Sequence, residues 1–244
     1  MKRTRLALVS LFGVAAIALA TDPVAAQTSS TAGLINDLNN KLLVAAIPIT
    51  ILTELALGYT VWKFRKNDEP KPTKENRRLE ISWTIATAIV LLFVGVASYG
   101  VLANENVTFQ QSKSQIAPDE NDVVIHVEAY QWGWAMTYPD EGGFQAPRGE
   151  NGPQVVVPND RDVYFNITSR DVLHSFAVPE LGLKQDAIPS QSNVLKTHTN
   201  EVGTYQGYCA EFCGVSHSQM YFSIKVVPQD QYQQFLQEQK NQSS

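Results

Sequence analysis

Apolar positions follow two patterns along the chain: long uninterrupted runs up to residue 103, and alternation with polar positions after it. The first run, residues 6–20, follows three basic residues and leads through small residues into a polar stretch. A basic start, a short apolar segment and a small-residue exit are typical of a secretory signal peptide. We therefore predict a signal peptide at residues 1–26, cleaved after Ala26, with an uncleaved transmembrane helix as the alternative.

Two further runs are long enough to cross a membrane as helices. Residues 42–62 contain one charge, Glu54, and residues 81–103 contain none. At 1.5 Å per residue, each helix spans a hydrocarbon layer of about 30 Å, so a transmembrane hairpin is predicted within residues 27–103. An ionisable residue inside a span is a candidate functional group, although burial of Glu54 against another subunit would also explain it.

The loop between the two spans indicates the orientation of the chain. Residues 63–80 contain seven Lys or Arg residues, and short loops rich in these residues stay in the cytoplasm. This predicts a multi-pass protein of the cell (plasma) membrane, with residues 104–244 on the extracytoplasmic side. The signal peptide predicts the same orientation.

Residues 104–244 predict a strand-rich domain. Short alternating segments separated by turn residues are typical of a small sandwich or barrel. The predicted strands are residues 123–128, 130–134, 154–157, 163–168, 192–199 and 221–227. Apolar residues at helical spacing in the tail, residues 229–239, predict a short closing helix.

Composition and charge exclude several classes of protein. With 44% hydrophobic residues, 14 Gly and two Cys among 244 residues, the chain is not disordered, collagenous or a disulfide scaffold. The net charge of −5 provides no basic surface for nucleic acid. Residues 104–244 hold 8 Lys and Arg against 17 Asp and Glu, a net of −9, which suits a basic partner or serves solubility alone.

Both cysteines lie in one short segment with two other metal-binding side chains: Cys209, Cys213, His217 and Met220 fall within twelve residues. Outside the cytoplasm a disulfide is the ordinary expectation for two cysteines, but it leaves His217 and Met220 unexplained. Thiolate, imidazole and thioether together are typical of copper electron-transfer sites, whereas zinc, the alternative metal, rarely takes Met.

Two cysteines on one loop, each able to bridge, point to a pair of coppers that share both thiolates. Such a pair needs a further imidazole from elsewhere in the chain. His126 and His198 lie within strand patterns and are interpreted as structural residues. His174, at the end of a predicted strand with apolar neighbours, is the better candidate.

The motif Leu173-His174-Ser175, residues 181–189 and the cysteine loop closely resemble subunit II of the haem-copper cytochrome c oxidases. The resemblance covers about two hundred residues, from the hairpin through the loop. It implies an all-β cupredoxin-like Greek-key barrel, anchored by a two-helix transmembrane hairpin and carrying the binuclear copper centre CuA. The implied copper ligands are His174, Cys209, Glu211, Cys213, His217 and Met220.

Within this ligand set the resemblance assigns separate roles. Cys209 and Cys213 would bridge the coppers. One copper would also take His174 and Met220, and the other His217 and the backbone carbonyl of Glu211. The side chain of Glu211 would bind magnesium shared with subunit I.

Three further residues receive interpretations from the same resemblance. Trp132, in the aromatic stretch 131–138, would be the residue at which electrons enter, while Trp134 is interpreted as barrel packing. Glu80 would lie at the mouth of a proton pathway into subunit I, although an acidic residue is common at a helix start. Arg170, Phe176 and Ser190 depart from the family pattern, and Arg170 leaves the identity of the electron donor open.

The leading hypothesis is electron transfer by one subunit of a proton-translocating cytochrome c oxidase. The chain would accept electrons from cytochrome c or a small blue-copper protein and pass them to haem, which only subunit I holds, for reduction of dioxygen to water. Its partners would be subunit I, other oxidase subunits and the lipid membrane, and no catalytic residue would lie in this chain. A membrane-anchored copper-delivery or copper-sensing protein is the alternative.

Acidic residues near Trp132 would attract a basic donor. Asp140, Glu141 and Asp171 are the residues predicted to lie close to it. Exposed charges of this kind steer encounter more than they hold a complex.

Overall fold

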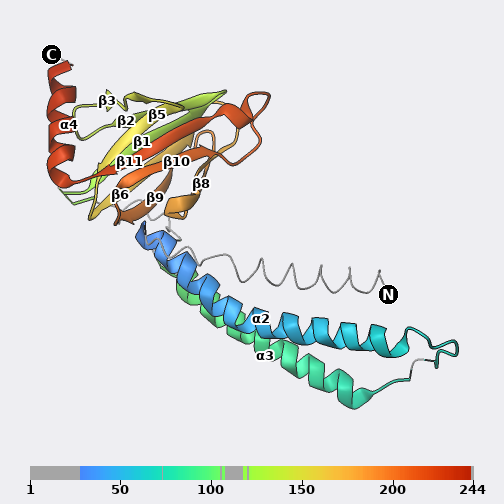
Figure 1. Ribbon diagram of the computed structural model, residues 1–244. Coiled ribbons are helices and arrows are strands. Elements are labelled where there is room, and N and C mark those ends of the chain that lie inside the picture. The colour runs from blue at the N-terminus through green and yellow to red at the C-terminus, as the bar shows by residue number, and fades with distance from the viewer. Residues whose placement is uncertain (1–27, 73, 105, 108–117, 120, 243–244) are drawn as a thin grey trace. The chain divides into compact units, whose positions relative to one another are not determined.

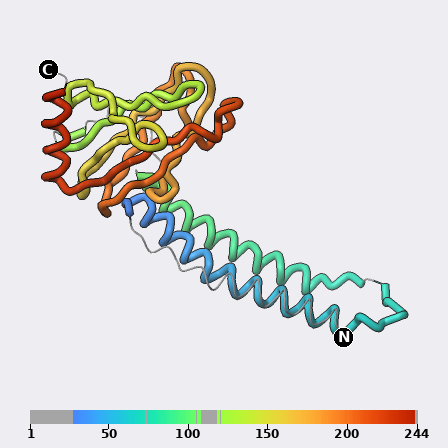
Figure 2. The backbone as a smooth tube through the Cα atoms, turned by 45° about the horizontal axis from the view of Figure 1, so that its top comes forward, coloured from blue at the N-terminus to red at the C-terminus, as the bar shows by residue number. Residues whose placement is uncertain are grey.

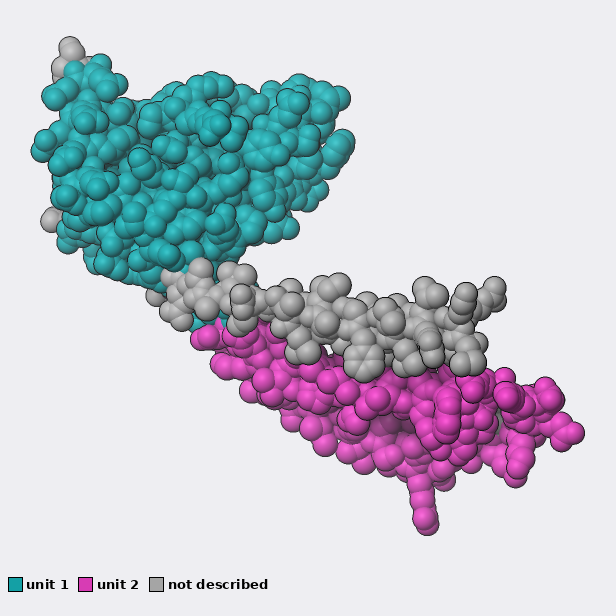
Figure 3. All heavy atoms as spheres, viewed as in Figure 1, with its two compact units in different colours: residues 1–36, 109–244 teal, residues 37–108 magenta. Residues whose placement is uncertain are grey.

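The structure is a computed structural model that describes residues 28–72, 74–104, 106–107, 118–119 and 121–242. The predicted signal peptide, residues 1–26, lies outside these residues. The chain divides into two compact units (Figure 3): residues 1–36 with 109–244, in teal, and residues 37–108, in magenta. The first unit holds the strands, and the second holds most of two long helices.

The first unit is a sandwich of two sheets, which confirms the prediction of a small β-sandwich or barrel (Figure 1). The strands are β1 (Val123–Tyr130), β2 (Gly133–Tyr138), β3 (Phe144–Gln145), β4 (Arg148–Gly149), β5 (Gly152–Pro158), β6 (Arg161–Ser169), β7 (His174–Val178), β8 (Leu183–Ala187), β9 (Asn193–Thr199), β10 (Gly203–Cys209) and β11 (Tyr221–Val227). Their order is β3-β2-β1-β6-β9 in one sheet and β4-β5-β11-β10-β7-β8 in the other. Some consecutive strands, such as β5 and β6, therefore belong to different sheets, and the chain crosses from one sheet to the other between them. As a result, loops that are distant in sequence lie close together in space.

Alternating burial along the strands forms the core between the sheets. In β1 and β6 every second side chain is buried, because successive side chains of a strand point to opposite faces. The largest fully buried side chains include Tyr138, Phe165, Phe176 and Phe222. The predicted closing helix is present as α4 (Gln229–Gln242), which buries Tyr232 and Leu236 and packs beside β5.

The predicted strand at residues 130–134 is wrong. β1 ends at Tyr130 and β2 begins at Gly133, so Gln131 and Trp132 form the turn between them. Aromatic and polar residues continue to alternate through this turn, so the pattern alone does not reveal it. The turn places Trp132 at an edge of the sandwich rather than within a sheet.

The second unit contains most of the helices α2 (Ser30–Phe64) and α3 (Arg77–Leu102), which lie side by side (Figures 1 and 2). Both are long and apolar enough to cross a membrane. The most apolar stretch of 18 residues in each helix contains no buried residue. The two predicted helices are confirmed, with wider bounds than residues 42–62 and 81–103. Asn76 caps α3 by accepting a hydrogen bond from the N–H of Leu79 (3.2 Å), as side-chain oxygens do at helix starts.

The start of α2 belongs to the packing of the first unit. Ser29 and Thr31 are at most 3% exposed. The Ser29 hydroxyl donates to the carbonyl of Leu181 (2.6 Å) and accepts from the N–H of Ala32 (3.1 Å). The backbone carbonyl of Thr28 accepts from the N–H of Asn200 (3.1 Å). A segment preceding the helices in sequence is therefore held by the β-sandwich.

Replacing Ser29 with Ala is expected to destabilise the first unit by about 1–3 kcal/mol, because the buried carbonyl of Leu181 would lose its donor. Urea unfolding of the full chain in detergent, followed by tryptophan fluorescence, would measure the free energy of unfolding. Gln234→Ala, at an exposed position of α4, is the control and should change it by less than about 0.5 kcal/mol. A loss in Ser29→Ala no larger than in the control would contradict this contact.

Candidate metal centre

Three connections of the sandwich meet around the two cysteines. They are the β1–β2 turn, the loop between β6 and β7, and the loop between β10 and β11. The backbone N–H of Gln131 donates to Asp171 (2.7 Å), and its side-chain amide donates to the carbonyl of Cys213 (2.7 Å). Gln131 thus joins all three connections, a role that no sequence pattern indicated.

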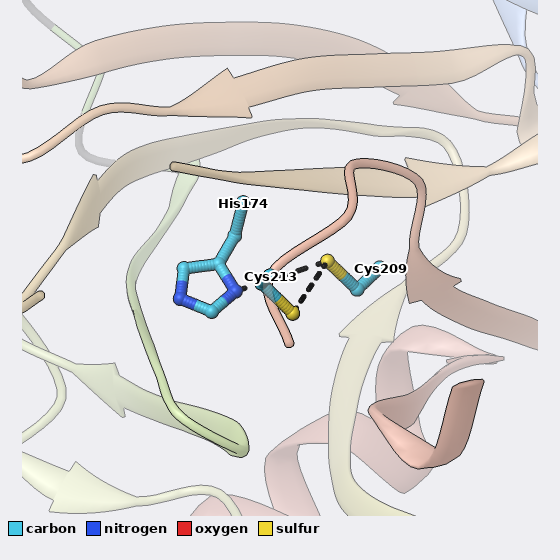
Figure 4. Close-up of side chains that lie close together, drawn as sticks. All are labelled: His174, Cys209 and Cys213. Carbon is cyan, nitrogen blue, oxygen red and sulfur yellow. Dashed lines mark hydrogen bonds between the residues drawn. The ribbon is translucent and has the colours of Figure 1, made fainter. Parts of the chain in front are cut away.

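The two cysteines are free thiols in the interior of this cluster (Figure 4). Cys209 and Cys213 are each 4% exposed, and their sulfur atoms lie 3.9 Å apart. This is far beyond the roughly 2.05 Å of an S–S bond. Burial, and then the neighbouring Cys209, raises the pKa of Cys213 to about 12, since a second thiolate is costly beside the first in an apolar site. The structure therefore does not contain the disulfide that was considered for these two cysteines.

The other predicted donors lie against the two sulfur atoms. His174 Nδ1 is 3.8 Å from Cys209 Sγ, and the backbone carbonyl oxygen of Glu211 is 3.2 Å from the same sulfur. His217 Nδ1 is 3.6 Å from Cys213 Sγ, and Met220 Sδ is 3.2 Å from it. The four other atoms predicted to bind copper therefore lie around the pair of cysteine sulfurs.

A hydrogen bond at its second ring nitrogen holds His174 in one orientation. The imidazole is fully buried, and its Nε2 lies 2.9 Å from Asp171 Oδ1. Burial alone would raise the pKa of Asp171, but hydrogen bonds from His174 and two backbone N–H groups outweigh burial and lower it. A proton on Nε2 leaves Nδ1, the atom that faces Cys209, free to bind a metal.

The two tryptophans of the aromatic stretch contact the ligand loop at different points. The indole N–H of Trp132 donates to the carbonyl of Cys213 (3.2 Å), and its side chain is 42% exposed. The indole N–H of Trp134 donates to the carbonyl of Met220 (3.3 Å), and that side chain is buried against Phe176 and Phe222. Trp134 therefore packs in the core, as predicted, but it also supports the loop.

The donor set fits copper better than the other metals considered. Three sulfurs, two imidazoles and one carbonyl favour a soft ion, and thiolate with thioether suits Cu(I). A closed zinc site would need four Cys or His ligands, and here a thioether lies among the donors instead. The ligand atoms of His174, Cys209 and Cys213 lie within 4.8 Å of one another, which suits a compact cluster.

Two histidines and two acidic residues singled out in the sequence lie away from this cluster. His198 pairs with Asp162 (2.7 Å), and His126 is exposed on β1. Asp140 and Glu141 follow β2, whereas Trp132 precedes it, so the expectation that these two acids lie near Trp132 is wrong. The third acid, Asp171, does lie beside the β1–β2 turn, where it accepts from the N–H of Gln131. Neighbours in sequence are separated here by the length of a strand, about 20 Å for six residues.

Two family models match the chain. The one described as cytochrome c oxidase subunit II, periplasmic domain, matches residues 123–227, and the one described as cytochrome c oxidase subunit II, transmembrane domain, matches residues 22–101. Cytochrome c oxidase subunit 2 of Cereibacter sphaeroides is 33% identical over 246 residues, which cover 87% of this chain and 78% of that protein. The chain belongs to the cytochrome c oxidase subunit II family.

Two further proteins named as oxidase subunit II are similar to this chain. The probable cytochrome c oxidase subunit 2 of Rickettsia felis is 32% identical over 215 residues, covering 81% of this chain and 65% of that protein. The crystal structure of the periplasmic domain of cytochrome oxidase subunit II from Bradyrhizobium japonicum is 29% identical, covers 52% of this chain and 100% of that one, and has a TM-score of 0.47. Membership of the subunit II family confirms the predicted cupredoxin-like fold and shows a membrane-anchored subunit of a haem-copper oxidase.

Proposed function

We propose that this chain is the subunit through which electrons enter its oxidase, and that its six clustered donors hold the binuclear CuA centre. The observation that carries the proposal is the pair of buried free thiols, with His174, His217 and Met220 within 3.8 Å of one or other sulfur. A copper pair in this site would supply a one-electron relay between cytochrome c or a blue-copper protein and haem in subunit I. Reduction of dioxygen and proton pumping would follow in that subunit.

The chain contributes rigidity to this site. His174 is fixed by Asp171, and the carbonyl of Cys213 accepts hydrogen bonds from both Gln131 and Trp132. The main-chain N–H of Cys209 donates to the carbonyl of Met220 (3.1 Å), which closes the loop on itself. Ligands held by such outer contacts keep their positions when the charge of the site changes.

The proposal also includes roles for two acidic residues and the orientation of the chain in the membrane. The backbone carbonyl of Glu211, which faces Cys209, would bind copper, and its carboxylate would bind magnesium shared with subunit I. Glu80, exposed in the first turn of α3, would lie at the mouth of a proton pathway. Residues 1–26 would be a cleaved signal peptide, residues 27–103 the membrane hairpin, and residues 104–244 the extracytoplasmic domain.

Copper loading of the full chain in detergent tests the proposed centre. We expect two coppers per chain by metal analysis, and electron paramagnetic resonance with hyperfine structure from two equivalent nuclei, because two shared thiolates couple the metals. His217→Ala should break this equivalence, while the matched His126→Ala should preserve it. One copper per chain, or hyperfine structure from a single nucleus, would reject the binuclear proposal.

The orientation has its own test. A reporter active only outside the cytoplasm should be inactive when fused within residues 67–74 and active when fused after residue 242, because the basic loop stays inside. Amino-terminal sequencing should begin at Gln27. An active reporter in the loop would contradict the orientation, and a mature chain beginning at Met1 would contradict the cleavage.

A further inference from the structure

One charged side chain lies in the middle of the apolar part of α2. Glu54 is the only Asp, Glu, Lys, Arg or His between Lys41 and Lys63, and α2 is long and apolar enough to cross a membrane. The family model of the subunit II transmembrane domain matches this part of the chain. An ionisable side chain inside a membrane span is costly unless it is paired, so it is a functional candidate by default. The proposed electron path does not use Glu54.

Glu54 is too deep in the span to reach water. The end of α2 near the loop carries Tyr59 and Trp62, whose ring centroids are 6.4 Å apart, and Lys63, which lies 5.2 Å from the Tyr59 centroid. Aromatic and basic side chains of this kind are found at membrane–water interfaces. Glu54 precedes Trp62 by eight residues, about 12 Å along the helix axis. Side chains of a helix also tilt toward its amino-terminal end, which directs Glu54 away from this interface.

The hairpin offers no hydrogen-bond donor to Glu54. Among the residues that the structure describes, none forms a hydrogen bond or an ion pair with its carboxylate. The hydroxyls of Thr50 and Thr53 donate to carbonyls one turn earlier in α2 (2.9 and 2.8 Å). Those of Thr84 and Thr87 do the same in α3 (2.8 Å each), and residues 81–103 contain no charge. A partner for the carboxylate must therefore come from another molecule.

The surface around Glu54 suits the approach of another helix. Thr50 and Gly58 lie one turn before and one turn after Glu54, on the same side of α2. We call these three residues the carboxylate face. An added Cβ at Gly58 would meet nothing within 4 Å outside the backbone of its own helix. Small residues at such positions let the backbones of two membrane helices come close together, so the carboxylate face combines room for a helix with an unpaired acid.

We propose that the carboxylate face binds a membrane-spanning helix of another subunit of the oxidase, and that this helix places a Lys or Arg side chain against Glu54. A carboxylate accepts hydrogen bonds and donates none, so a cationic donor both neutralises its charge and occupies its oxygens. Apolar contact alone gives little specificity in lipid, whose tails are as apolar as Leu. One buried ion pair determines which helix binds and at what depth, as buried polar residues determine register in coiled coils.

Dissociation of the assembled oxidase tests this pair. The oxidase is purified from membranes through a tag on this chain and heated in detergent, and the other subunits that stay with the tag are quantified over time. We expect the Glu54→Gln complex to dissociate more than about tenfold faster than the native one, because the basic partner keeps its charge and loses its counter-ion. Glu54→Lys should dissociate faster still. A native rate in Glu54→Gln rejects the ion pair.

Matched variants separate the charge from packing. Leu52 is 68% exposed and lies on the opposite side of α2 from Glu54, because two residues turn a helix by about 200°. Leu52→Ala should dissociate within about twofold of the native rate, whereas Glu54→Ala should match Glu54→Gln. Equal rates in the two Ala variants reject the proposal. Urea unfolding of each isolated chain in detergent should match the native chain, and a loss in the Glu54 variants there would show that Glu54 acts within this chain instead.

The charge of Glu54 has a chemical test. Dicyclohexylcarbodiimide reacts with a protonated carboxyl in apolar surroundings and not with a carboxylate in an ion pair. Mass spectrometry should find Glu54 modified in the isolated chain in detergent and unmodified in the assembled oxidase. Modification in the assembled oxidase would show a neutral carboxyl and would reject the basic partner. If the isolated chain is also unmodified, the dissociation rates alone decide.

Discussion

Replacing Cys213 with Ser is expected to abolish the two-metal centre and to lower oxidase turnover by more than about 100-fold. Even the loss of a residue that only hydrogen-bonds to a metal ligand costs up to about 100-fold in metal affinity or activity. Cys213 Sγ lies 3.9 Å from Cys209 Sγ, 3.6 Å from His217 Nδ1 and 3.2 Å from Met220 Sδ. It is therefore the common neighbour of three other donors. A hydroxyl of similar size is a hard, neutral ligand and cannot replace a soft thiolate.

Two further variants serve as comparisons for Cys213→Ser, one as a control and one at another ligand. Ser218→Ala, at an exposed position of the same loop, should leave copper content and turnover unchanged. Met220→Leu conserves volume in a site that is 1% exposed, and it should retain both coppers while shifting the reduction potential, since a thioether is a weak ligand. Metal analysis, paramagnetic resonance and turnover check all three variants. Two equivalent copper nuclei in Cys213→Ser would refute the ligand assignment.

Replacing Trp132 with Ala is expected to slow electron transfer from a carrier protein by roughly 100-fold. This is the loss of rate expected when two reacting groups are misplaced by about 1 Å. The exposed ring and its hydrogen bond to Cys213 are both lost, while no ligand atom is removed. Because the ligands remain, the copper spectrum and reduction by dithionite should stay almost unchanged. Rapid mixing with a reduced blue-copper carrier protein measures the transfer rate, and the copper spectrum is recorded beside it.

A graded series separates the ring from its N–H group. Trp132→Phe keeps an aromatic contact but removes the donor to Cys213, so its rate should fall between those of the native chain and Trp132→Ala. Tyr164→Ala, on β6 and paired with Lys196, is the control for loss of an aromatic ring elsewhere in the domain. A native rate in Trp132→Ala would show that electrons enter at another residue.

Local patterns in the sequence were sufficient for the parts of this protein that depend on neighbouring residues. The two long apolar runs became α2 and α3, because an uninterrupted apolar segment satisfies its backbone hydrogen bonds best as a helix. Alternating segments such as β1 and β6 became strands with one buried face. The spacing of Cys209, Cys213, His217 and Met220 was itself a chemical signal, since few other functions require those four side chains on one loop.

Contacts between distant segments were decided only by the tertiary structure. Asp171 faces His174 because both lie at one strand connection. Gln131 bridges to Cys213 because β1 and β10 end close to the start of β7. Burial of residues 28–32 in the sandwich has the same origin. No local period encodes such contacts, since each depends on how separate elements pack.

The distribution of charge shows the difference most clearly. The sequence by itself determined that residues 104–244 are acidic, and it placed Asp140 and Glu141 within nine residues of Trp132. The fold moved those two acids to the other end of β2 and paired Arg170 with Glu128 across two strands. A strand carries the chain about 3.3 Å per residue in one direction, so closeness in sequence becomes distance in space, and only strand pairing decides which charges meet.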